Sequence, residues 1–378
     1  MVTPLRVTLL VHNAGTGAVA RAQALTAVLE ELGHTPRSVS MRGGQLWVPV
    51  RDTPFARTFS FVDVAGLEEV VATGTDLLLA VKPLSNSLGF ALRLAHRHGV
   101  PLLADVDDPE QEVRTTYLPV REQLRRLVAD PRLTVRRHQL RHVARLLPTT
   151  VSNPVLQAWY GGELVPHPRR DPGPGAPHTS DRPVLGFIGT VRDYKGVDEL
   201  RDAVAELAGE GWRLRVTHEP PADPRPWEEW VGSRTTGTRR MLDTSDVVVV
   251  ASAPEKYAHA QLPLKLVDAM LSGRAVVVSD TGPLPWAAGP GVPVVPHGDR
   301  AALVAVLRRL ADPAERERVG AAARATALAR YTPAAVAPAM QRAIDAAMAR
   351  GGGLGPAVAL LEGHLPRRRR RTTSTSSG

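Results

Sequence analysis

Both halves of the sequence open with the same succession of an apolar strand, a glycine-containing loop and an amphipathic helix. In the first half these elements are predicted at residues 5–11, 12–17 and 19–32. In the second half they are predicted at residues 184–188, 189–196 and 197–207. Short apolar strands that alternate with helices are typical of βαβ units, which build parallel sheets. The chain is therefore predicted to be an α/β protein made of two similar domains.

A second constraint lies in residues 261–280, which read QLPLKLVDAMLSGRAVVVSD. A helix-period run is predicted to end at Gly273, because glycine readily adopts the left-handed conformation that closes a helix. The continuous apolar run at 275–278 then predicts a buried parallel strand. Asp268 falls inside the helix and Lys265 lies three residues earlier on the same face. Taken alone, this pattern indicates an ordinary helix–strand unit with a surface ion pair.

The domain boundaries follow from composition. Residues 171–183 are rich in proline, glycine and serine, which predicts a linker between domains at 1–170 and 184–330. The length of 378 residues fits two domains. Residues 333–350 are predicted to form a helix, and residues 351–378, rich in glycine, arginine and serine, are expected to be disordered.

Composition excludes several classes of site. The chain has no cysteine, so disulfides and thiolate metal sites are ruled out. No run of 18 apolar residues is present, and we expect a cytoplasmic location. The net charge is +9, but it includes the arginine run 367–371, and aromatic residues make up 4% of the chain. With no aromatic residues interleaved among the basic ones, a nucleic-acid partner is disfavoured.

The predicted helix at residues 122–145 is strongly basic. The simplest interpretation is a solvated helix face. An acidic-lipid or anionic-acceptor surface is the alternative, which would give peripheral contact with the inner face of a membrane.

In the second half, Arg192 and Lys195 occupy the loop after the first strand, just before a helix. A strand end, a helix N-terminus and two cations are together suited to a diphosphate. The loop 253–262 precedes the helix that carries Asp268, so its backbone N–H groups point toward the same anion. Asp268 can accept hydrogen bonds from the paired hydroxyls of a ribose. These features together predict a sugar-nucleotide site.

In the first half, Gly15 and Gly17 lie in the loop before the first helix, where a tight turn or contact with a ligand are both open. Lys82 follows the predicted strand 77–81, and the aspartates Asp105, Asp107 and Asp108 follow the strand 101–104. Ligands of open α/β sheets bind at such carboxyl ends of strands. A helix N-cap is the alternative for the aspartates, and a metal site is disfavoured because no further ligand cluster is visible.

The sequence resembles the glycosyltransferase family 4 group over nearly all of its length, up to about residue 350. The resemblance rests on the N-terminal strand with its glycine loop, VSNPVLQAWYGGELVPHP, GFIGTVRDYKG, LPLKLVDAMLSGRAVVVSD and the helix YTPAAVAPAMQRAI. It implies the GT-B fold, in which two Rossmann-like domains face a central cleft. The last helix, at 331–350, is then expected to cross back to the first domain.

The resemblance also implies an activity. It is the retaining transfer of a sugar from a nucleotide-diphosphate donor to a hydroxyl acceptor, with no metal and no cofactor. The donor binds the second domain and the acceptor the first. Lys195 corresponds to the diphosphate lysine, and Asp268 replaces the usual glutamate at the ribose. The family's arginine position holds Thr190, so Arg192 is proposed as a displaced substitute.

The position of the family's other acidic residue is occupied by Ala260, and Gln261 or His259 is expected to take over its contact with the donor sugar. Lys265 is open to pairing with Asp268, to supporting the loop, or to solvation. The remaining residues expected on the donor side are Gly189, His218, Glu255 and Leu262. The alternatives are an epimerase, hydrolase or pseudo-glycosyltransferase of the same fold, or a donor-binding protein without activity.

Overall fold

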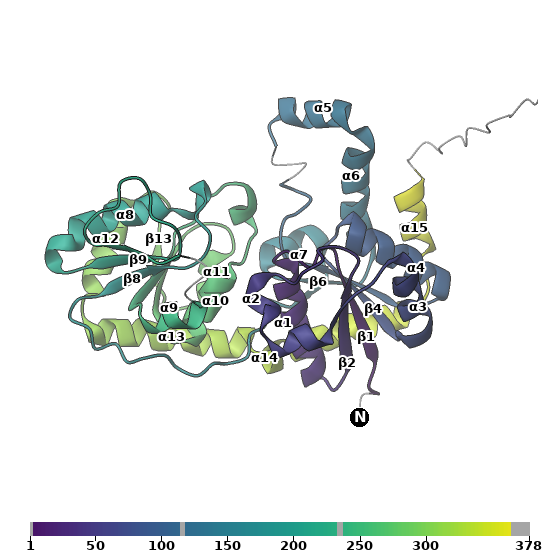
Figure 1. The fold of residues 1–378 in the computed structure, drawn as a ribbon, viewed down its shortest axis with the longest axis horizontal. Helices are drawn as coiled ribbons and strands as arrows, with labels where there is room; N and C mark the ends of the chain where they lie inside the picture. Colours follow the sequence, from purple (N-terminus) through teal and green to yellow (C-terminus); the bar gives the residue numbers. More distant parts are fainter. Residues whose placement is uncertain (1–2, 114–117, 233–236, 364–378) are drawn as a thin grey trace, which may run out of the picture.

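The computed structural model describes residues 3–113, 118–232 and 237–363. Two α/β domains lie side by side, and a long helical segment runs beneath both of them (Figure 1). The tail beyond residue 363 falls outside the described residues.

The first domain is built on a fully parallel sheet in the order β3-β2-β1-β4-β5-β6-β7. Its strands are β1 (Arg6–Val11), β2 (Thr35–Ser40), β3 (Phe59–Phe61), β4 (Leu77–Val81), β5 (Leu102–Val106), β6 (Thr149–Val151) and β7 (Glu163–Leu164). Its helices include α1 (Ala18–Glu31), α2 (Val48–Arg51), α3 (Val64–Gly74), α4 (Phe90–His98), α5 (Val120–Ala129), α6 (Pro131–Leu146) and α7 (Pro154–Tyr160).

The second domain repeats this arrangement with a parallel sheet in the order β10-β9-β8-β11-β12-β13. Its strands are β8 (Val184–Phe187), β9 (Arg213–Val216), β10 (Glu228–Trp230), β11 (Val247–Val250), β12 (Ala275–Ser279) and β13 (Val294–Val295). Its helices include α8 (Val197–Leu207), α9 (Thr238–Asp243), α10 (Leu264–Leu271), α11 (Leu284–Ala288), α12 (Arg300–Arg309) and α13 (Pro313–Tyr331). In each domain the strand order reverses beside the first strand, as in the Rossmann fold. The prediction of two Rossmann-like α/β domains is confirmed.

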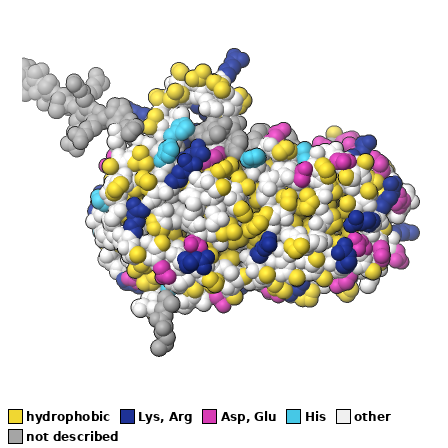
Figure 2. Space-filling view, turned by 180° about the vertical axis from the view of Figure 1, so that it is seen from behind, with side chains coloured by type: hydrophobic (Ala, Val, Ile, Leu, Met, Phe, Trp, Pro, Cys, Tyr) yellow, Lys and Arg dark blue, Asp and Glu magenta, His cyan; other side chains and the backbone are white. Residues whose placement is uncertain are grey.

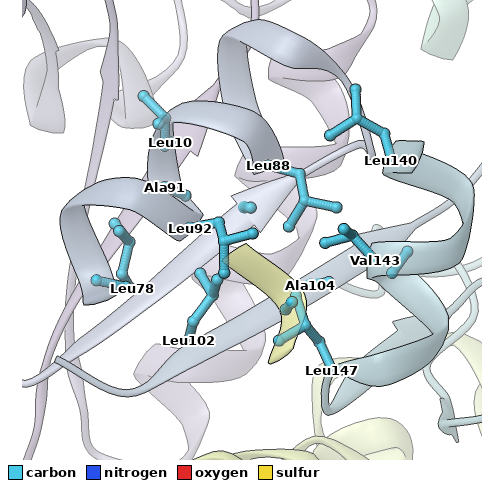
Figure 3. Packing of buried hydrophobic residues seen from close by; sticks show 14 of the residues in the cluster. Leu10, Leu78, Leu88, Ala91, Leu92, Leu102, Ala104, Leu140, Val143 and Leu147 are labelled. Carbon is cyan, nitrogen blue, oxygen red and sulfur yellow. The ribbon is translucent and has the colours of Figure 1, made fainter. Parts of the chain in front are cut away.

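The central strands are apolar along their whole length because helices cover both faces of each sheet. In β4, Leu78 and Ala80 face the cluster formed with α4 and α6, whereas Leu77, Leu79 and Val81 face the cluster formed with α1. Figure 3 shows the first of these clusters, in which leucines of α4 and α6 pack over the sheet. This alternation of side chains follows from the two-residue period of a strand.

The chain crosses between the domains at two adjacent places. Helix α13 packs on the second domain, and α14 (Pro333–Arg350) follows directly and packs on the first. Val336 and Met340 of α14 lie in the core cluster that also contains α1. The other crossing is made by the segment that follows β7 and contains Arg169. It lies beside the first crossing, since the Arg169 backbone N–H donates to the carbonyl of Tyr331 at 2.6 Å.

Two sequence-based expectations are wrong in detail. Residues 355–362 form helix α15 (Gly355–Glu362), in the segment that was expected to be disordered. Leu354, Ala357 and Leu361 are buried against the first domain's core, and this apolar contact stabilises the helix.

The basic segment, expected as one helix at 122–145, is divided into α5 and α6. The break has a local cause: the Asp130 side chain accepts from Leu133 N–H at 2.9 Å, and Pro131 starts the new helix without a backbone N–H. Within the described ranges, no helix is long and apolar enough to cross a membrane.

Candidate active site

A cavity of about 1270 Å³ lies between the two domains at the carboxyl ends of their strands. From the first domain it is lined by Thr16, Gly17, Arg21, Lys82, Asp107, Asp108, Glu110, His167 and Arg169. From the second domain it is lined by Gly189, Thr190, Tyr194, Lys195, Thr217, Tyr257, Gln261, Leu262, Lys265 and Asp268.

Lys195 lies on the second-domain side, at the end of the loop after β8. The next residue, Gly196, has a positive φ of 67°, and a Cβ there would lie 2.6 Å from the carbonyl oxygen of Ala251. Only glycine allows this approach, which brings the start of α8 against the end of β11. The Lys195 ammonium donates to the carbonyl of Thr190 at 3.1 Å. Burial, and secondarily the charge of Arg192, lowers the pKa of Lys195.

Lys265 projects from α10 into the same cavity. Its ammonium lies 3.9 Å from the centroid of the Phe187 ring, at the end of β8, in a cation–π contact. Burial, together with the nearby Lys195 ammonium, lowers the pKa of Lys265 to about 7. Of the three alternatives left open for Lys265, pairing with Asp268 is not found among the described ion pairs, and Asp268 pairs with Arg169 instead. Two lysines from separate elements therefore share one end of the cavity.

This arrangement predicts a pH-dependent stability. The pKa of Lys265 is 10.5 in the unfolded chain and about 7 in the folded chain. Folding therefore releases a proton between these values, and the free energy of unfolding rises with pH across that window. We expect Lys265→Met to remove this contribution, so that its unfolding free energy rises less than that of the wild type between about pH 7 and about pH 9. Urea titrations at several pH values measure the difference, and equal slopes would contradict the assignment. Arg192→Met, at an exposed position, is the control.

Asp268 lies one turn further along α10 and lines the cavity. Its Oδ1 accepts a hydrogen bond from Arg169 Nε at 3.1 Å. Burial raises the pKa of Asp268, and the Arg169 guanidinium opposes that rise. Arg169 belongs to the segment that crosses between the domains. The carboxylate is therefore held in place from the other side of the cleft.

Several expected donor-side residues lie outside the lining of the cavity. Arg192 and Glu255 are exposed. His218 contacts the carbonyl of Glu219, and His259 stacks on Trp159 of the first domain with ring centroids 6.4 Å apart. Gly15 also lies outside the lining, whereas Gly17, Gly189 and Leu262 are part of it.

Ala260 is fully buried, and its side chain belongs to the core cluster of the first domain. Its carbonyl accepts from Asn153 Nδ2 at 2.9 Å, at the start of α7. The neighbouring Gln261 lines the cavity and donates from Nε2 to Asp108 Oδ1 at 3.0 Å. The position where an acidic residue was expected therefore packs against the other domain, and Gln261 reaches across the cleft to the acidic group there.

That acidic group surrounds Lys82 on the first-domain side. The Lys82 ammonium lies 2.9 Å from Asp107, 2.7 Å from Asp108 and 3.0 Å from Glu110. Burial would lower the pKa of Lys82, but the three carboxylates outweigh it and raise the pKa well above its usual value. Lys82 also has a φ of 68°, which is unusual for a residue with a side chain. One ammonium among three carboxylates leaves the group net negative.

Asp105 is not part of this group. Its side chain is fully buried. Arg21 Nη2 donates to Asp105 Oδ1 at 2.7 Å, and Thr150 Oγ1 donates to the same oxygen at 2.7 Å. The expectation that Asp105 faces an acceptor is therefore wrong. The residue is the last but one of β5, and its carboxylate is occupied in joining β5 to Arg21 of α1 and Thr150 of β6.

His167 is a cavity residue that the sequence interpretation missed. It is almost fully buried, and no hydrogen-bond partner for its Nδ1 is found within the described ranges. Burial, and then the charge of Arg21, lowers the pKa of His167 well below its usual value. Burial therefore favours the neutral form of the imidazole. The available signal was the run VPHP directly before the linker, which is part of the stretch VSNPVLQAWYGGELVPHP that carries the family resemblance.

The described residues hold no group of three or more histidine and acidic side chains arranged to bind a metal ion.

Comparisons with known proteins agree on the fold. Residues 182–312 match the family model described as "Glycosyl transferases group 1". No curated protein sequence matches the chain. Among solved structures, Anabaena Alr3699/HepE in complex with UDP and glucose is 13% identical with a TM-score of 0.65, over 90% of this chain and 99% of that one. Sucrose-phosphate synthase from Thermosynechococcus elongatus is 15% identical with a TM-score of 0.64, over 92% and 100%.

A third similar structure is the apo form of the lipopolysaccharide outer core galactosyltransferase WaaB, 12% identical with a TM-score of 0.60, over 90% of this chain and 99% of that one. At these identities the likeness shows a common fold. The expected GT-B architecture of two facing domains is confirmed.

Proposed function

We propose that this chain, whose second domain is a glycosyl transferases group 1 domain, transfers a sugar from a nucleotide-diphosphate donor to a hydroxyl-bearing acceptor. One observation carries the proposal. Lys195 and Lys265 project into one end of a cleft between two Rossmann-like domains, facing the carboxylate group around Lys82. A site with cations on one side and carboxylates on the other is suited to hold an anionic donor against an uncharged hydroxyl acceptor.

The two lysines are proposed to hold the donor diphosphate. As the bond from the sugar to the diphosphate breaks, negative charge grows on the phosphate oxygens, and fixed cations stabilise that charge. Arg192, expected as the second cation beside the diphosphate, is exposed and lies outside the cavity lining. Lys265 lines the cavity and is proposed to fill that role instead. In this proposal the lysines do the work of a metal ion.

Asp268 is proposed to bind the ribose hydroxyls, with Arg169 fixing its orientation through the hydrogen bond to Oδ1. A uridine base is the favoured candidate, since a protein of the same fold has been solved with UDP. A carboxylate that is already oriented by an arginine loses less freedom when a ribose binds.

On the first-domain side, Asp107 and Asp108 are proposed to orient the acceptor hydroxyl. The new bond forms between the acceptor oxygen and the sugar carbon on the face that the phosphate leaves. The acceptor proton passes to a phosphate oxygen of the departing diphosphate. The configuration at the sugar carbon is retained. Holding both partners in this geometry removes a large part of the entropic barrier.

A nucleotide-binding measurement tests the proposal. A ligand that binds only the folded state adds about 2.7 kcal/mol to the free energy of unfolding at a concentration of 100 times its Kd, and so raises the melting temperature. We expect UDP, the favoured donor nucleotide, to raise the melting temperature of the protein more than GDP or ADP. The same titration with Lys195→Ala should show a much smaller rise. If none of the three nucleotides changes the melting temperature, the proposed donor site is wrong.

The second candidate is a protein that binds the donor without transferring its sugar. It is favoured by Thr190 and Ala260, which stand where the family resemblance implies an arginine and an acidic residue. Release of UDP from a UDP-sugar in the presence of candidate acceptors separates the two functions. Binding without release, across acceptors of several classes, would favour the second candidate.

A further inference from the structure

Helices α5 and α6 form a projection that stands out from the body of the first domain (Figure 1). Helix α5 has no buried residue. Val120, Leu124 and Val128 are 72%, 58% and 84% exposed. Their spacing of four residues places them on one face of the helix. Soluble surfaces rarely gather apolar side chains on one exposed helix face without a partner.

The charges around this apolar face are mainly positive. Segment 120–146 contains eight arginines against two acidic residues. Arg121 and Arg132 are exposed beside the tip, and Arg125 shares the single carboxylate of Glu122 with Arg126. In Figure 2 the projecting tip is covered mostly by hydrophobic side chains, with a Lys or Arg side chain at its edge.

The composition of the tip favours a lipid surface over a protein. Protein interfaces depend on buried aromatic anchors such as tryptophan and tyrosine, and α5 contains none. The tip is also a convex projection. A short helix with aliphatic residues on one face and arginines beside them is typical of helices that lie in the membrane interface.

We propose that the α5–α6 tip docks on an anionic lipid surface, with Val120, Leu124 and Val128 entering the interface and Arg121 and Arg132 at the level of the headgroups. The short aliphatic side chains supply apolar burial, and the arginines add attraction to the negative surface. The proposal does not depend on the transfer reaction.

The place of the projection in the chain adds a consequence for the acceptor. Glu112 at its base lies two residues after the lining residue Glu110, and Arg141 of α6 lies 2.9 Å from the Glu112 carboxylate. Docking would therefore bring the first-domain side of the cavity toward the lipid. We therefore expect the acceptor to be a molecule anchored in that membrane. This part of the inference rests on the proposed function.

Vesicle co-sedimentation of the full chain tests the docking itself. We expect binding to vesicles that contain phosphatidylglycerol, weaker binding to phosphatidylcholine alone, and a decrease as salt is added. The double variant Leu124→Asp and Val128→Asp should bind at least about tenfold more weakly. Its thermal melt should match the wild type, because neither side chain is buried.

Val64→Asp is the matched control, since Val64 is 54% exposed on α3, away from the tip. It should bind like the wild type. Equal vesicle binding by the double variant and the wild type would overturn the proposal and assign the attraction to the arginine run 367–371. Failure of the wild type to bind phosphatidylglycerol vesicles would also overturn it. Self-association that the double variant abolishes, without vesicle binding, would identify a protein partner instead. UDP-induced stabilisation, measured separately, reports on the donor site and is unaffected by either result.

Discussion

Replacing Lys195 by alanine is expected to lower kcat/KM for sugar transfer by about two to three orders of magnitude. The ammonium projects into the cleft, where the leaving diphosphate gains charge in the transition state. Removing a fixed charge that acts mainly in the transition state lowers kcat more than it raises KM. Initial rates at varied donor concentration measure kcat and KM separately.

Two variants sharpen this result. Arg192→Ala changes a cation in the same loop that is exposed and lies outside the lining of the cavity, so its rate should stay within a few-fold of the wild type. Lys195→Arg keeps the charge on a bulkier side chain and should recover part of the activity. Near-normal transfer by Lys195→Ala, or a large loss in Arg192→Ala, would show that the diphosphate is held elsewhere.

Restoring an acidic residue at position 260 is expected to damage the protein. Ala260 is fully buried in the first domain's core, so Ala260→Glu would place a carboxylate among apolar side chains, away from the donor. Burying an unpaired charge costs on the order of 3 kcal/mol or more. We expect a corresponding fall in the free energy of unfolding, measured by urea denaturation, and no gain in transfer rate.

The control for that experiment is Ala301→Glu, the same change at an exposed position near the start of α12. Its stability should change by less than about 0.5 kcal/mol. If Ala260→Glu kept its stability and transferred sugar faster, the side chain at 260 would face the donor, and the proposed arrangement of the loop 253–262 would be wrong.

The fold could be predicted from local patterns, whereas part of the site could not. Apolar strands such as β4 and β11, with glycines at the ends of the helices beside them, mark a parallel sheet directly in the sequence. The ligand end of that sheet follows from topology, so Lys82, Asp107 and Lys195 were expected near the cavity for a physical reason.

The missed contacts are those made between distant segments. Asp268 pairs with Arg169, 99 residues away, and Lys265 turns to the ring of Phe187. Sequence spacing favours pairing of Lys265 with Asp268 because they share a helix face, but an isolated pair of this kind contributes only a few tenths of a kcal/mol. Tertiary contacts easily outweigh that preference. Likewise, the burial of Asp105 depends on Arg21, which no local pattern connects to it.

The first domain is completed by segments from both ends of the described chain. Helices α14 and α15 supply Met340, Ile344 and Leu361 to core clusters whose other members, apart from Ala260, come from the first 165 residues and from the same C-terminal segment, 336–361. During synthesis, the strands of the first sheet leave the ribosome first. The second domain must then be synthesised before α14 and α15 emerge and can dock on that sheet. Until then the nascent first domain exposes apolar surface, and the second domain, whose elements are continuous in sequence, is the part able to fold as it emerges.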